Sequence, residues 1–73
     1  MKRIEGDFVS DGNVIFNDED VIIEGNLCCK EVFAKNITVA GNYIVEVDVV
    51  SGDQEVGGYQ VVSRSQKVGG YLS

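Results

Sequence analysis

Apolar residues recur at every sixth position along almost the whole chain. One interval in this series spans five residues, and all the others span six. An α-helix places apolar residues 3.6 positions apart and a half-buried strand places them two apart, so neither element explains the spacing. A period of six is typical of β-solenoids, in which three short strands and three corners complete one coil. The series comprises Val9, Ile15, Val21, Leu27, Phe33, Val39, Val45, Val50, Val56, Val62 and Val68.

Glycines recur with the same period and indicate corners. Gly-Gly-Tyr follows both Val56 and Val68, while Gly-Asp or Gly-Asn begins two positions after Ile4, Ile23 and Val39. Glycine adopts sharp and crowded turns at the least steric cost. The chain has nine glycines and no proline, and proline would remove a donor from strands that are paired on both sides. The pattern therefore predicts an all-β solenoid, or β-helix, of short parallel strands.

The segments Ile4-Glu-Gly-Asp-Phe and Ile23-Glu-Gly-Asn-Leu carry a resemblance to known families. From about residue 3 onward the chain resembles hexapeptide-repeat β-solenoids, and its style is nearest to the bactofilins. Bactofilins are polymer-forming cytoskeletal scaffolds with a right-handed solenoid and cores longer than this chain, so the resemblance implies self-assembly without catalysis. Hexapeptide acyltransferases are trimers with a left-handed solenoid and a catalytic histidine. This chain has no histidine and lacks the small residue two positions before each inward aliphatic. The repeat itself leaves the handedness open.

Length limits the architecture to one small domain. At roughly 18 residues per coil, residues 1–73 make about four triangular coils in a single domain. No segment approaches the ~20 consecutive apolar residues of a membrane span. Lys2 and Arg3 are not followed by the apolar run of a secretory signal, so we expect a cytoplasmic protein.

The six-residue series is expected to point inward and form the core. One column holds Val9, Leu27, Val45 and Val62; the second holds Ile15, Phe33, Val50 and Val68; the third holds Val21, Val39 and Val56 above Arg3. Because successive strand residues face opposite sides, the neighbours of the second column should point outward. They would form an apolar outer face, which favours an interaction surface, from Val14, Phe16, Val32, Ala34 and Val49. A register shifted by one in the N-terminal half would instead place some of these residues in the core.

The two ends of the column also favour association. The sequence reaches Tyr71 and Leu72 without a polar cap, and an open row of backbone donors and acceptors favours end-to-end contacts. Residues 4–31 carry eight acidic side chains and one lysine, whereas residues 56–73 carry Arg64 and Lys67 and no acid. This asymmetry either favours head-to-tail stacking or only keeps the protein soluble. The leading hypothesis is a homo-oligomer, a dimer or a short polymer, that uses the outer face or Tyr71 and Leu72.

Charge suggests an alternative partner. The net charge is −6 and the pI is near 4.3, which disfavours direct nucleic-acid binding because phosphate contacts need a basic stripe. Small phage-borne inhibitors, including some anti-CRISPR proteins, are similar to this chain in size and acidity. The alternative hypothesis is a phage-type inhibitor that imitates nucleic acid and occupies the basic surface of a partner protein. Residues 17–20 also fit a solvated corner rich in turn formers. The acids assigned to partner binding are Asp18, Glu19, Asp20, Glu24, Glu46 and Asp48.

No catalytic, cofactor or metal site is expected. The chain lacks histidine and a nucleophile–base pair, and its Gly-Gly pairs lack the lysine and helix of a phosphate loop. Residues 17–24 lack the glycine of a calcium loop. Cys28 and Cys29 are adjacent, so in a strand they face opposite sides and are poor partners for one metal or disulfide. We predict two reduced thiols, with Cys28 outward, in a protein that is not an enzyme.

Overall fold

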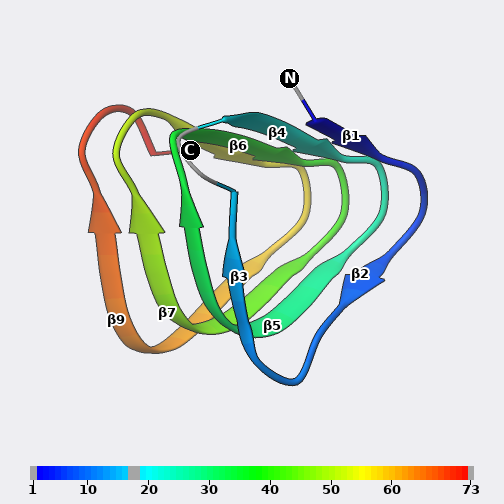
Figure 1. The fold of residues 1–73 in the computed structure, drawn as a ribbon, viewed down its shortest axis with the longest axis horizontal. Coiled ribbons are helices and arrows are strands. Elements are labelled where there is room, and N and C mark those ends of the chain that lie inside the picture. The colour runs from blue at the N-terminus through cyan, green and yellow to red at the C-terminus, as the bar shows by residue number, and fades with distance from the viewer. Residues whose placement is uncertain (1, 17–18, 73) are drawn as a thin grey trace.

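The structure, a computed structural model, describes residues 2–16 and 19–72, which form strands and no helix. Every strand pairing in this part of the chain is parallel, and the strands stack into a solenoid of about four coils (Figure 1). The predicted fold class is confirmed. The strands are β1 (Lys2–Ile4), β2 (Phe8–Val9), β3 (Asn13–Ile15), β4 (Asp20–Ile23), β5 (Leu27–Ala34), β6 (Asn36–Val39), β7 (Tyr43–Val50), β8 (Gln54–Val56) and β9 (Gln60–Val68).

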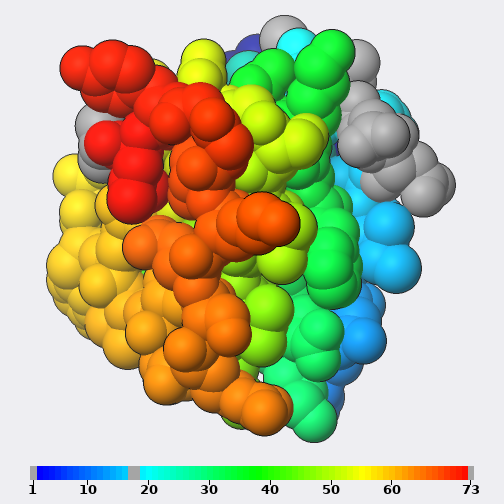
Figure 2. All heavy atoms as spheres, turned by 90° about the vertical axis from the view of Figure 1, so that its left-hand side faces the viewer, coloured from blue at the N-terminus to red at the C-terminus, as the bar shows by residue number. Residues whose placement is uncertain are grey.

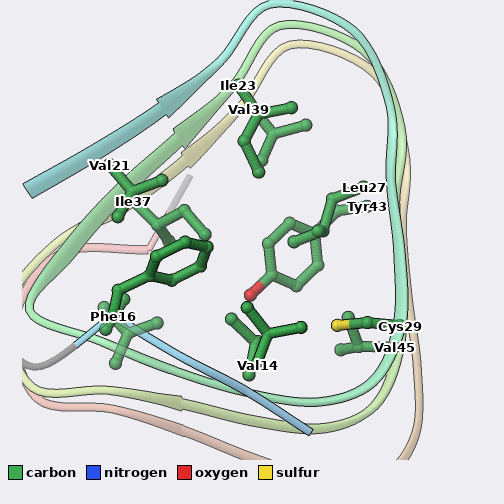
Figure 3. Packing of buried hydrophobic residues seen from close by; sticks show 13 residues of the cluster. Val14, Phe16, Val21, Ile23, Leu27, Cys29, Ile37, Val39, Tyr43 and Val45 are labelled. Atoms are coloured by element: carbon green, nitrogen blue, oxygen red, sulfur yellow. The ribbon is translucent and has the colours of Figure 1, made fainter. Parts of the chain in front are cut away.

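Two sheets make three walls around the core. Wall 1 is the sheet ordered β1-β4-β6-β8. The second sheet, ordered β2-β5-β7-β9 with β3 also paired to β5, bends midway along its long strands. Its first halves, with β2, form wall 2, and its second halves, with β3, form wall 3. Figure 3 shows these walls enclosing the buried side chains. The first corner joins walls 1 and 2, the second joins walls 2 and 3, and the third leads back to wall 1.

Each wall sends two side chains inward per coil, separated by one outward residue. In the second coil the inward pairs are Val21 and Ile23, Leu27 and Cys29, and Val32 and Ala34. All six side chains are buried, as strand alternation requires when one face of a strand meets the core. Burying an aliphatic side chain of this size contributes on the order of 1.5–3 kcal/mol, so the column of inward pairs is the main source of stability.

The predicted register is right over most of the chain and wrong at three positions of the series. Val21, Leu27, Val39, Val45 and Val50 are buried, and Val56, Val62 and Val68 pack against the core. Val9 and Ile15 instead point outward with 72% and 62% of their surface exposed, and Phe33 is half-buried on the outer side. Their neighbours Phe8, Val14, Phe16, Val32 and Ala34 supply the inward side chains.

The cause of the error is that the coils differ in length. Val21 pairs with Lys2, 19 residues earlier, and with Ile37, 16 residues later, whereas Gln54 lies 17 residues beyond Ile37. A corner that takes one residue more or fewer reverses which side chains face the core in the next strand. A constant period of 18 therefore loses the correct phase after a short or long corner.

Side-chain ladders hold the first and third corners. At the first corner Asn26 N donates to Asp7 Oδ1 at 3.0 Å, Asn42 N to Asn26 Oδ1 at 2.8 Å, and Tyr59 N to Asn42 Oδ1 at 3.2 Å. The third corner repeats the arrangement, with Asp53 N donating to Asn36 Oδ1 at 2.7 Å and Tyr71 N to Asp53 Oδ1 at 2.8 Å. These bonds satisfy backbone donors where the strand ladder is interrupted. Asp and Asn side chains, all but Asn36 directly after a glycine, therefore join successive coils.

Glycine is required at the first corner because the coils approach closely there. A Cβ atom on Gly41, which precedes Asn42, would lie 2.9 Å from the Gly25 carbonyl oxygen and even closer to the side chain of Asn26. Gly6, at the same corner of the first coil, adopts φ = 78°, which L side chains rarely adopt. The repeated Gly-Asp and Gly-Asn pairs thus combine a tight approach with a hydrogen-bond acceptor.

Candidate interaction surface

An apolar row runs along the outside of wall 2 over all four coils. Val9 pairs with Cys28, Cys28 with Ile44, and Ile44 with Val61, so the four occupy one register position on successive strands. Val9, Ile44 and Val61 are 72%, 38% and 44% exposed, and Cys28 is also exposed. We call these four residues the outer row. This continuous apolar strip across every coil is the candidate contact surface of the molecule.

A charged residue occupies the second corner in each coil, beside the outer row. From the first coil to the last these residues are Asp11, Lys30, Glu46 and Arg64, which alternate in sign. The second coil carries two charges at this corner, because the half-buried Glu31 follows Lys30 and pairs in register with Asn13 and Val47 at the start of wall 3. Lys30 N donates to the Gly12 carbonyl at 3.2 Å, and β9 adds one extra residue where it passes β7, so the four residues share a corner and not one paired register position. Glu46 is half-buried and the other three are exposed. We call these four residues the charged ridge.

A second, shorter apolar row lies outside wall 3. Ile15 pairs with Phe33 and Phe33 with Val49, and the next residue in register is Lys67. Ile15 is 62% exposed, whereas Phe33 and Val49 are half-buried. The lysine ends the apolar character in the last coil, so this row covers only three coils.

Most of the predicted self-association face lies in the core. Val14, Phe16, Val32 and Ala34 are at most 9% exposed, which contradicts the expected outward placement. Their burial follows from the shifted phase in the first two coils. Val49 does point outward on wall 3. Tyr71 and Leu72 follow the last strand and are 74% and 44% exposed, and Leu72 forms a parallel bridge with Gln54 of β8 in the last coil. Figure 2 shows this end of the column, with the C-terminal strands in orange to red.

The predicted acidic residues do not form one patch. Glu19 and Asp20 are exposed at the third corner, Glu24 is exposed at the first, and Glu46 stands at the second. Asp48 is fully buried, so its expected surface role is wrong. Asp18 lies outside the described residues.

Arg3 faces solvent instead of the core. It pairs in register with Ile22, between the inward positions of wall 1, and its side chain is 66% exposed. Its Nε atom donates to Glu24 Oε2 at 2.6 Å, and the guanidinium also forms an ion pair with that carboxylate. The expected place of Arg3 beneath an inward column is therefore wrong, and one acid of the predicted patch is neutralised.

A polar cluster inside the last two coils was not predicted. Tyr43 Oη donates to Asp48 Oδ1 at 2.6 Å, and Gln66 Nε2 donates to Asp48 Oδ2 at 3.1 Å. Gln60 Oε1 accepts from Gln54 Nε2 at 2.7 Å and from Gln66 Nε2 at 3.3 Å, which links the three walls. Within the described residues, Gln54 Oε1 is the one buried side-chain oxygen or nitrogen without a partner. The only sequence signal was an acid flanked by valines in a predicted strand.

Burial controls the chemistry of the enclosed titratable groups. It is the main reason that the pKa of Tyr43 lies far above its usual range, and the charge and hydrogen bond of Asp48 raise that pKa further. Burial likewise raises the pKa of Cys29 to about 11, with smaller contributions from Cys28 and Asp48. Cys29 is thus a buried thiol and Cys28 an exposed one, as predicted. A protonated, enclosed thiol is a poor nucleophile.

The described residues contain no group of three or more His, Cys, Asp or Glu side chains placed to hold a metal ion. In the same part of the chain, no helix has the length and apolar character needed to cross a membrane. Comparison with known protein families, with curated proteins and with solved structures finds no match.

Proposed function

We propose that this chain is a non-enzymatic protein–protein interaction module that associates with further copies of itself. The observation that carries the proposal is the outer row, in which one outward register position is apolar in every coil. The outer side of a sheet exposed to water ordinarily carries polar side chains. Removing this strip from water favours association.

Size sets the expected strength of association. The molecule measures 26 × 25 × 21 Å, so a single wall offers less than the ~800 Å² per partner of a standard interface. We therefore expect an affinity on the order of micromolar or weaker. The competing geometry is a polymer built through Tyr71 and Leu72, whose exposed side chains lie on the last coil.

The test is light scattering coupled to size exclusion, from about 5 µM to about 500 µM protein. The wild type is compared with Ile44→Lys in the middle of the outer row. Thr38→Lys is the matched control, since Thr38 is exposed on the wall 1 strand of the same coil. We expect a mass that rises from monomer toward dimer for wild type and control, and a monomer for Ile44→Lys. A wild type that stays monomeric throughout refutes the proposal, and a mass that keeps rising beyond the dimer favours the polymer.

The alternative function, inhibition of a partner protein by an acidic surface, is supported by the charge of the first coils. Glu5, Asp7, Asp11, Glu19 and Asp20 are all exposed there. A basic partner would bind them in a strongly salt-dependent manner. The test is whether the chain displaces duplex DNA from DNA-binding proteins at about 50 mM salt and fails to do so at about 500 mM. No displacement at low salt excludes this function for the proteins tested.

A further inference from the structure

We infer that two copies of this chain pair wall 2 against wall 2 in antiparallel orientation, and that the charged ridge selects this arrangement. The inference rests on the proposed self-association and specifies its geometry. A two-fold axis that lies between the two walls and runs parallel to their strands is perpendicular to both columns. It places the first coil of one copy against the fourth coil of the other and keeps the second corner of each copy on the same side. Each register position on wall 2 then meets the same position of its partner in reverse order, as an isologous interface requires.

Reversal makes the charged ridge complementary to itself. Asp11 of one copy faces Arg64 of the second copy, and Lys30 faces Glu46 of the second copy. Each of these contacts occurs twice by symmetry, so all eight ridge charges of the dimer meet an opposite charge. The outer row reverses in the same way, which sets Val9 against Val61 and Cys28 against Ile44, apolar on apolar.

The ridge charges are available for such contacts. The one ion pair among the described residues joins Arg3 to Glu24 at the first corner, so no ridge residue forms an ion pair with a described residue of its own chain. Three of the four ridge side chains are exposed. At the other edge of wall 2, the exposed Asp7 of one copy would face the exposed Tyr59 of the second copy, a carboxylate opposite a hydroxyl donor.

The parallel arrangement lacks this match. A two-fold axis along the column brings the charged ridge of one copy against the first-corner ladder of the other. Asp11 would then face Asp7 of the second copy, a like-charge contact, and the other three ridge charges would face Asn26, Asn42 and Tyr59. Charge complementarity decides between orientations of equal apolar contact because like charges brought together are unfavourable.

The test uses charge reversal in mixed solutions. Lys30→Glu alone brings acid against acid twice per dimer, and Glu46→Lys alone brings base against base twice. Each variant by itself should show a dissociation constant raised about tenfold or more at low salt. An equimolar mixture of the two variants restores every opposite-charge contact, so a heterodimer should form with near wild-type affinity. Analytical ultracentrifugation of one variant carrying a fluorescent label measures this exchange.

The double variant Lys30→Glu/Glu46→Lys separates association from stability. Its ridge reads acid, acid, base, base, which is still complementary on reversal although neighbouring coils of one chain now carry like charges. We expect its dimer affinity to match that of the wild type while its thermal midpoint falls. Loss of dimerisation in the folded double variant, or failure of the two single variants to associate with each other, overturns the antiparallel geometry and leaves self-association standing. A wild type that is monomeric throughout overturns both.

Discussion

The hydrogen bond between Tyr43 and Asp48 gives the sharpest stability prediction. Both side chains are fully buried. The tyrosine hydroxyl donates to Asp48 Oδ1 at 2.6 Å, and Gln66 Nε2 donates to Asp48 Oδ2 at 3.1 Å. Tyr43→Phe keeps the ring and removes one of the two donors to a buried carboxyl group. Hydrogen bonds to charged groups contribute about 1.5–3 kcal/mol. We expect a loss of about 2 kcal/mol in the free energy of unfolding, which lowers the midpoint of a domain of this size by roughly 8–16 °C.

The assay is urea unfolding followed by circular dichroism, with Tyr59→Phe as the matched control. Tyr59 is 58% exposed, so its hydroxyl is served by water and its removal should change stability by less than about 0.5 kcal/mol. Asp48→Val completes a double-mutant cycle, because valine fills the equivalent inward position of the preceding coil, Val32. The double variant should be more stable than the sum of the single losses predicts, since no buried polar atom of this pair is left unmatched. A Tyr43→Phe protein as stable as wild type refutes the reasoning.

Alkaline pH provides an independent readout of the same contact. The pKa of Tyr43 is raised on folding, so the folded protein holds the phenol proton at pH values where the unfolded chain releases it. The contribution is fully present below about pH 10 and is lost as pH rises above that value, by up to about 1.4 kcal/mol per pH unit. Tyr43→Phe should lack this part of the decline. Parallel stability curves for the two proteins above pH 10 would contradict the assignment.

Three further predictions concern the register, the thiols and the corner ladder. Val32→Asp should abolish folding because Val32 is fully buried, whereas the Phe33→Asp protein should fold because Phe33 faces outward. Circular dichroism of the two purified variants tests this. A folded Val32→Asp protein and an unfolded Phe33→Asp protein would support the register expected from the period of six. In the native protein at pH 8, a thiol reagent should modify the exposed Cys28 and leave Cys29 unmodified, because Cys29 is buried and its pKa is raised to about 11. Mass spectrometry should then show one adduct per chain. Two adducts that form equally fast would contradict the burial of Cys29. Asn42→Ala should lower the free energy of unfolding by about 1 kcal/mol because it removes one acceptor of the first-corner ladder; an unchanged urea midpoint would show that water replaces that acceptor.

The architecture could be predicted from the sequence because the same spacing of apolar residues recurs in every coil. The six-residue period needs only that each wall contribute an apolar side chain per coil, and this condition holds at Val21, Val39 and Val45 despite the unequal coil lengths. The phase is more demanding, since it depends on how many residues each corner takes. From Cys29 to Val32 the corner takes two residues, whereas from Ile23 to Leu27 it takes three. Corner length is set by contacts between coils, which a period does not reveal.

The predicted interaction face lies in the core for the same reason. A shift of one residue exchanges the two sides of wall 3, so Val14 and Val32 are core residues although they were expected on the surface. On wall 2 the same shift exposes Val9, which was expected in the core and is the first residue of the outer row. Asp48 was expected on the surface as one of the acids assigned to partner binding, but its side chain is fully buried. Its donors lie 5 residues earlier and 18 residues later in the chain, at Tyr43 and Gln66. Only the stacking of coils brings them together.

Alternating charge on the ridge has two consequences that depend differently on the number of coils. Within one chain, corresponding residues of adjacent coils are about 5 Å apart at the backbone, so alternation avoids like-charge neighbours in a stack of any height. Between two chains in antiparallel contact, the same alternation is complementary only when the number of layers is even, because reversing an odd series sets each charge against its own kind. The four described coils satisfy that condition from Asp11 to Arg64. If the alternation only stabilises the single chain, a variant that lacks one coil should keep its stability against like-charge contacts. If the alternation also selects the antiparallel dimer, that variant should lose dimerisation, because its three ridge charges would each face a like charge of the second copy.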